Sequence, residues 1–419
     1  MESTKNVVVI SALVLVAAAG SASAQFLPVA PLPAVSNGLF DHANLVVSQV
    51  GLTNRSLAAG SAAAEVVLRE LNFAGQFTGD QVLMRTVLSG AQRAVTLNGT
   101  GTTNGHLTLN SSGQSELFVG GYDAAPGTLA VQGTNADATR RVAGRVTIGS
   151  LAQNTQTAFQ ANQNGFLVGS YTGDALRSVT SVDGRTTVIG GGNSNGGSIN
   201  LGGVRRIGFA VAGTPVDTVL SGPTIISPAG PALNNVRVVN INTFDANRVY
   251  ASSNQNSAGG NFVGISVMQA NNTALRVIDT GTGSSPNDFQ FVAASTVYIA
   301  DDRSVASGGG LQRWDRVANV WSLSYTLGDG LGNIGLRSLT IGRENVNGVL
   351  STVIFAITGN LPNQATSLVR VTDAGVGSAF SVLATSSVQA PFRGVELIPT
   401  PGAVALLGLG GLAAFRRRR

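Results

Sequence analysis

An all-β fold is predicted by three properties of this 419-residue sequence: its many glycines, its scarcity of charge and its short apolar runs. The chain contains 54 glycines, and charged residues make up only 11% of it. Brief apolar runs that end in small residues are typical of strands joined by tight turns. The sequence contains no cysteine, so no disulfide can form and the hydrophobic core alone must stabilise the fold.

The apolar runs recur along the chain at intervals of about 40 to 57 residues, which indicates a repeat. Their central residues are Phe118, Leu167, Phe209, Tyr250, Tyr298 and Phe355, and an earlier run covers residues 45–48. Pairs of strand-like segments joined by polar turns accompany them. These pairs are residues 175–179 with 186–189, 262–266 with 275–278, 310–315 with 321–325, and 368–373 with 380–383. A unit of this length with several short strands is typical of a propeller blade.

We therefore expect a β-propeller over residues 25–397, and division of this range into such units gives seven blades. The apolar runs are expected to be the crowded inner strands. Residues 392–397 are expected to be a last strand that closes the ring against the N-terminal unit. A β-sandwich and a right-handed β-helix are the alternatives, although the rungs of about 20 to 25 residues that a β-helix requires are not found.

The N-terminus has the pattern of a secretory signal peptide over residues 1–24. Lys5 supplies a positive charge, residues 7–19 are apolar, and Ala22 and Ala24 form a small-residue cleavage site before Gln25. The pattern predicts export through the Sec translocon and removal of the segment by signal peptidase.

The C-terminus, residues 398–419, combines a proline pair, an apolar segment and a basic end. Pro399, Thr400 and Pro401 precede residues 402–415, which would span about 21 Å as a helix. A bilayer core is roughly 30 Å thick, so the segment predicts a transient membrane anchor rather than a permanent one. The basic cluster that would remain in the cytoplasm is Arg416, Arg417, Arg418 and Arg419.

This tail resembles the PEP-CTERM sorting signal of exported bacterial proteins, although Thr400 stands where that motif has a glutamate. The resemblance implies cleavage near the proline pair by an exosortase-like enzyme and brief contact with the inner membrane. The repeat also resembles secreted β-propellers that carry such tails, over residues 45–71, 107–128 and 295–397. That second resemblance supplies a fold but no activity.

The charge of the chain disfavours a nucleic-acid partner. Removal of both terminal segments takes away Lys5, Glu2 and the four terminal arginines, which lowers the net charge from +5 to +1. The mature chain would then have no basic face that could neutralise phosphates.

Candidate ligand residues are few. Asp301 and Asp302 follow an expected inner strand and so fall on one rim of the propeller. They could bind Ca²⁺ or another ligand, or form a solvated turn held by Arg303, which we favour. His42 and His106 lack a second histidine at ligand spacing, so both are expected to be structural or solvent-exposed. We identify no catalytic residue, and no cofactor is expected apart from this weak Ca²⁺ alternative.

Three further segments have ordinary structural interpretations. Asp329 lies in a glycine-rich turn that lacks the acidic residues of a calcium loop. Residues 190–197 predict a flexible loop between strands, because no helix pattern follows them. Trp314, Trp321 and Tyr325 could stack on a sugar but are expected to pack in the core or between blades.

The sequence thus predicts an exported propeller of the cell envelope, cell surface or extracellular matrix with a non-catalytic binding or structural role. A glycan or another component of the cell envelope is a suitable ligand for its hydroxyl- and amide-rich surface. The alternative is a secreted enzyme acting on polysaccharide. Such an enzyme needs two carboxylates roughly 5 to 10 Å apart at one end of the central channel.

Overall fold

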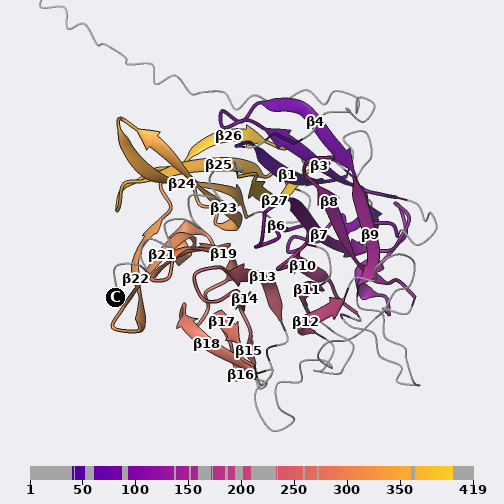
Figure 1. Ribbon diagram of the computed structural model, residues 1–419, viewed down its shortest axis with the longest axis horizontal. Helices are drawn as coiled ribbons and strands as arrows, with labels where there is room; N and C mark the ends of the chain where they lie inside the picture. Colours follow the sequence, from indigo (N-terminus) through magenta and orange to yellow (C-terminus); the bar gives the residue numbers. More distant parts are fainter. Residues whose placement is uncertain are drawn as a thin grey trace, which may run out of the picture.

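The computed structural model describes residues 40–41, 43–51, 61–86, 93–135, 138–150, 152–158, 171, 173–184, 187–193, 202–208, 233, 235–257, 260–270, 273–359 and 364–399. Within these residues, six antiparallel sheets are arranged around a common centre (Figure 1). The fold is therefore all-β and a β-propeller, as the repeat predicts.

Each sheet is a blade, and its strands follow one another from the centre outward. Blade 1 contains β27 (Phe392–Leu397), β1 (Leu45–Val50), β3 (Val66–Leu71) and β4 (Phe77–Leu83). Blade 2 contains β6 (Leu107–Leu109), β7 (Glu116–Tyr122), β8 (Arg141–Thr147) and β9 (Gln153–Ala158). Blade 3 contains β10 (Leu176–Thr180), β11 (Thr187–Gly192) and β12 (Gly203–Gly208).

The second half of the ring has the same order. Blade 4 contains β13 (Val236–Asn242), β14 (Arg248–Ser253), β17 (Gly264–Met268) and β18 (Ala274–Asp279). Blade 5 contains β19 (Pro286–Ala293), β20 (Thr296–Asp301), β21 (Gly310–Val317) and β22 (Val320–Leu327). Blade 6 contains β23 (Leu336–Val346), β24 (Val349–Thr358), β25 (Ser367–Asp373) and β26 (Ser381–Thr385).

Outside the blades lie two short pairs and two 3₁₀ turns. They are β2 (Ala63–Ala64) with β5 (Leu97–Asn98), β15 (Asn256–Ser257) with β16 (Gly260–Asn261), η1 (Val131–Gly133) and η2 (Val305–Ser307). None of the helices in the described part of the chain is long and apolar enough to cross a membrane.

The ring closes by pairing the two ends of the propeller. Strand β27, from the C-terminal end, lies antiparallel to β1 and forms the innermost strand of blade 1. Val47 pairs with Val395 in the middle of this ladder. The expectation that residues 392–397 close the ring is confirmed.

The blade count expected from the sequence is not confirmed, because the described strands form six blades rather than seven. The expected run around Leu167 lies outside the described residues, and of the run around Phe209 only Ile207 and Gly208 are described, at the end of β12 in blade 3. In blade 3, the strand at the position that the apolar runs occupy in the other blades is β11. Its three glycines hide its apolar character. Two of the expected blades therefore correspond to this one sheet.

The apolar runs also occupy a different place from the one expected. Strands β1, β7, β14, β20 and β24 contain them, and each is the second strand of its blade. A second strand is paired on both edges and covered on both faces by neighbouring blades, so nearly all its residues are apolar or small. The innermost strands carry more polar residues because they also face the channel.

Buried polar side chains connect every blade to the next. Each connection joins a side chain of one blade to the backbone of the following blade and so satisfies buried groups that would otherwise destabilise the fold. The six connections are Ser48–Gly105, Thr108–Val179, Ser178–Val239, Ser252–Asn287, Asp288–Leu339 and Ser338–Val395.

Five of the six inner strands have a β-bulge near their first residue. There the pairing with the second strand skips one or two residues, and a bulge of this kind re-aims the side chain that it inserts. The inserted residues include Arg177, Arg237, Asn287, Arg337 and Arg393.

Candidate binding cavity at the end of the central channel

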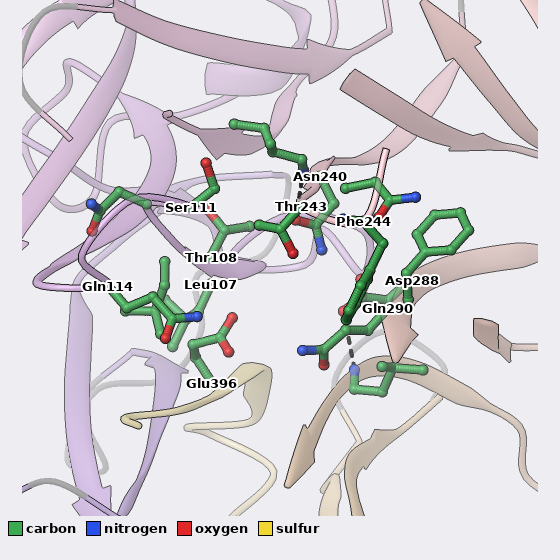
Figure 2. Close-up of a pocket in the computed structure, with 16 residues that line it drawn as sticks. Leu107, Thr108, Ser111, Gln114, Asn240, Thr243, Phe244, Asp288, Gln290 and Glu396 are labelled. Carbon is green, nitrogen blue, oxygen red and sulfur yellow. Dashed lines mark hydrogen bonds between the residues drawn. The ribbon is translucent and has the colours of Figure 1, made fainter. Parts of the chain in front are cut away.

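A cavity of about 100 Å³ lies where the inner strands end. Its walls come from β6, β13, β19, β23 and β27, the innermost strands of five blades, so it lies on the central axis of the propeller. The turns that follow β6 and β13 form its rim (Figure 2). At the roughly 30 Å³ that each molecule occupies in liquid water, the cavity has room for about three water molecules.

Most of the cavity wall is polar. Thr108, Asn240 and Gln290 line it from three different blades, and Figure 2 shows them around one space with Glu396. The Thr108 hydroxyl donates to the Val179 backbone, and the Asn240 side chain bonds the backbones of Phe289 and Ile241. The Gln290 side chain is partly exposed to this space. Such groups donate and accept hydrogen bonds and carry no charge, so they suit a neutral polar ligand.

Glu396 enters the cavity from β27. Burial raises the pKa of this carboxyl to about 8, and repulsion from Asp288 adds to the shift. The hydroxyl of Thr340 donates a hydrogen bond to Glu396 Oε1 over 2.9 Å. Because its pKa is raised to this value, Glu396 holds a proton at neutral pH and can donate a hydrogen bond to a ligand.

Asp288 also lines the cavity but is occupied by structural hydrogen bonds. Its Oδ2 accepts bonds from the Ser338 hydroxyl over 3.1 Å and from the Leu339 backbone over 3.0 Å, both in the next blade. Its Oδ1 accepts a bond from the backbone of Phe289. Asp288 is only 5% exposed, so its main role is to join blades 5 and 6.

Two phenylalanines give the cavity an apolar edge. Phe244, in the turn after β13, keeps 43% of its surface exposed. Phe291 is held by edge-on contacts with Tyr250 at 4.9 Å and Trp321 at 5.9 Å between ring centroids. An exposed aromatic face beside hydroxyl and amide groups is suited to stacking on a sugar ring.

The cavity matches no motif in the sequence. Its polar residues are single positions in strands that are far apart along the chain. The sequence signal that could have indicated the cavity is a polar residue within a short apolar strand, as in residues 236–242 and 286–293. His106, a residue considered in the sequence, is 1% exposed beside this channel, with Nδ1 3.8 Å from Asp288 Oδ2. His42 lies outside the described residues.

Asp301 and Asp302 lie at the opposite end of the channel, because Asp301 pairs with Pro286 at the start of β19. Arg303 binds both oxygens of Asp301, as the interpretation of an arginine-held turn predicts, but Asp301 is fully buried rather than solvated. Asp302 accepts hydrogen bonds from Arg337 and Asn287. The two carboxylates thus have separate partners.

The aromatic residues singled out in the sequence lie in packing positions. Trp314 is 8% exposed, and Trp321 is partly buried in the cluster that contains Phe289. Tyr325 donates a hydrogen bond to Asp373 of the next blade. Asp329 lies in a turn, where its carbonyl oxygen accepts a hydrogen bond from Phe380.

Part of the glycine-rich segment is strand rather than loop, which corrects the expectation for residues 190–197. Gly190, Gly191 and Gly192 belong to β11, and the residues from 194 to 197 lie outside the described part. A Cβ on Gly191 would come within 2.6 Å of both Val236 and Val239. Glycine is present because the next blade packs directly on this strand.

The residues of the expected terminal signals also fall largely outside the described residues. Ala22, Ala24, Gln25, Thr400, Pro401 and Arg416 to Arg419 are not described, whereas Pro399 is. Among the described residues, no group of three or more histidine, aspartate or glutamate side chains is placed to hold a metal ion.

No protein-family model matches the chain, and no curated protein matches it significantly. Its function is therefore inferred from the cavity and from the sequence.

Proposed function

We propose that this chain is an exported β-propeller of the cell envelope or extracellular matrix that binds a neutral glycan at the end of its central channel. The cavity itself is the main support for the proposal. It combines amide, hydroxyl and protonated carboxyl groups with an exposed phenylalanine at its edge. The binding is proposed to be non-catalytic.

The enzyme alternative has one observation in its favour, since Asp288 and Glu396 both line the cavity and repel each other electrostatically. A glycosidase needs one carboxyl as acid and the other as a free nucleophile or base. Asp288 accepts three hydrogen bonds, two of them from the next blade, so it is poorly placed to attack a substrate. We therefore favour binding. An assay for new reducing ends on soluble polysaccharides should show none, and their appearance in wild type but not in Glu396→Gln would establish the enzyme instead.

The ligand proposal is tested by screening the purified protein against an array of neutral oligosaccharides, followed by calorimetry with the best one. Gln290→Ala should weaken binding about tenfold, because one hydrogen bond to the ligand is lost. Phe244→Leu keeps an apolar side chain but removes the aromatic face, so it should also weaken binding.

The matched control is Gln389→Ala, the same substitution at an exposed residue outside the cavity. It should bind like wild type. Equal binding by Gln290→Ala, Phe244→Leu and Gln389→Ala would show that the sugar binds elsewhere, and no binding to any neutral glycan would refute the proposal.

Export is supported by the signal-peptide pattern of residues 1–24 and by the resemblance of residues 398–419 to a sorting signal. We propose that signal peptidase cuts before Gln25 and that an exosortase-like enzyme cuts near Pro399, Thr400 and Pro401. The test is the intact mass of the protein from its own cells. A mass without residues 1–24 and without Arg416 to Arg419 is expected, and retention of the four arginines would contradict the sorting proposal.

A further inference from the structure

Four arginines gather at the end of the channel opposite the cavity. Arg177, Arg237, Arg337 and Arg393 are residues inserted by the bulges at the starts of β10, β13, β23 and β27. Inner strands of a propeller start at the same end, so the bulges repeat one feature in four blades. The blade 5 bulge inserts Asn287 instead.

These guanidinium groups are close enough to repel one another. Burial lowers the pKa of Arg237 to about 10, and repulsion from Arg177 and Arg337 contributes. Burial lowers the pKa of Arg393 to about 9, again with repulsion from Arg337. Both groups therefore stay charged at neutral pH, although Arg393 is only 5% exposed.

Several of their donors lack partners. The Nε atoms of Arg177, Arg237 and Arg393 and Nη1 of Arg337 are buried without a hydrogen-bond partner among the described residues. Unpaired buried donors on charged groups cost free energy. Because donors of this kind recur at the same position in four blades, we infer that a bound ligand accepts their hydrogen bonds.

The charges at this end do not balance. Asp174 lies 3.7 Å from Arg177, and Asp302 lies 3.1 Å from Arg337. Asp301 is paired with Arg303 and adds no net charge. Asp302 and Asp174 also attract Arg237, so the two carboxylates are shared among the arginines. Four arginines and two carboxylates leave a net charge of two positive charges on the group.

We propose that this end of the channel binds a doubly charged oxyanion, phosphate or sulfate, as a free ion or as a group on a sugar. Guanidinium groups bind such oxyanions through paired hydrogen bonds. Two negative charges match the net charge of two positive charges on this arginine group. The site is separate from the neutral cavity and does not rest on the glycan proposal.

The test is calorimetric titration of the full purified protein with inorganic phosphate, sulfate, glucose 6-phosphate and glucose at constant ionic strength. Phosphate or sulfate should bind saturably at one site, and glucose should not bind there. Arg237→Gln should weaken anion binding at least tenfold. It should also raise the melting temperature of the anion-free protein, because it removes an unbalanced buried charge.

Arg343→Gln is the control, since Arg343 is exposed and the substitution changes charge equally. It should bind anions like wild type. Arg237→Lys keeps the charge but loses the paired donors and should bind with intermediate affinity. Glucose 6-phosphate binding at least tenfold more tightly than phosphate would identify a sugar-borne group, and equal affinity would identify the free ion. Equal anion binding by Arg237→Gln and wild type, or no anion binding by wild type, would overturn the proposal.

Discussion

Glu396 illustrates how one residue can serve a neutral ligand site. It sits in the strand that closes the ring, and burial raises its pKa to about 8 from an ordinary 4.5. Thr340 donates to one of its oxygens, which leaves the protonated oxygen free to donate into the cavity. A carboxyl in this state can replace an amide as a partner for sugar hydroxyls.

The raised pKa of Glu396 predicts a loss of stability as pH rises. Between about pH 4.5 and 8 the folded state holds a proton that the unfolded state has released, so the free energy of unfolding falls over this window. Glu396→Gln mimics the protonated form and should abolish this part of the pH dependence. The pKa shift from 4.5 to about 8 corresponds to roughly 4–5 kcal/mol, so at pH 8 the variant should be more stable than wild type by up to this amount.

Urea unfolding at several pH values measures this difference. Glu344→Gln, at the surface of blade 6, is the control and should keep the wild-type slope between about pH 4.5 and 8. A wild-type stability that stays constant across the window would mean that Glu396 is ionised in the folded protein.

Among the strands, local sequence explains only part of what forms. Alternating apolar residues around polar turns predict the hairpins β10–β11, β17–β18, β21–β22 and β25–β26, and all four form. The glycines at residues 190–192 predict a loop, although they belong to β11. Their identity is set by the neighbouring blade, and contacts between distant residues leave no local pattern.

The close packing of β11 on β13 gives a second prediction. Gly191→Val would force a side chain to within 2.6 Å of Val236 and Val239 and should destabilise the protein by about 1–3 kcal/mol. Gly149→Val is the matched control, because nothing lies within 4 Å of a Cβ at Gly149. Thermal melts followed by circular dichroism should show a lower melting temperature for the first variant only. Equal melting temperatures would mean that blades 3 and 4 do not pack in this way.

The bulges could not be predicted from the sequence either. A pair such as Leu336-Arg337 looks like an ordinary alternating strand, in which the arginine would face away from its apolar neighbour. The inserted Arg337 instead breaks the alternation, and its side chain donates a hydrogen bond to Asp302. The sequence alone therefore does not indicate that the four arginines lie together, because they meet only in the assembled ring.

For the whole molecule, the propeller class was predictable because a repeat of this length has few structural solutions. The number of blades was not, since blade 3 has one atypical second strand and only three described strands. The cavity could not be predicted either, because its polar lining residues meet only when five blades close around one axis. These residues are Thr108, Asn240, Gln290 and Glu396.

Ring closure by β27 gives a whole-molecule prediction. Deletion of residues 391–419 removes the innermost strand of blade 1 and uncovers the apolar cluster around Val47 and Val395. The truncated protein should lose its cooperative thermal transition. Deletion of residues 400–419 alone removes only the tail and should leave the melting temperature unchanged. A cooperative transition at the wild-type temperature in the longer truncation would contradict closure by β27.

A crystal structure of the mature protein with the oligosaccharide found by array screening would test the proposed glycan site most sharply. We expect six blades closed by β27 and one sugar ring bound at the mouth of the channel cavity. Its hydroxyls should lie within hydrogen-bond distance of Gln290 and Glu396, with Phe244 against its face. A sugar bound on an outer rim, or a cavity that stays filled with water at saturating ligand, would contradict the proposal.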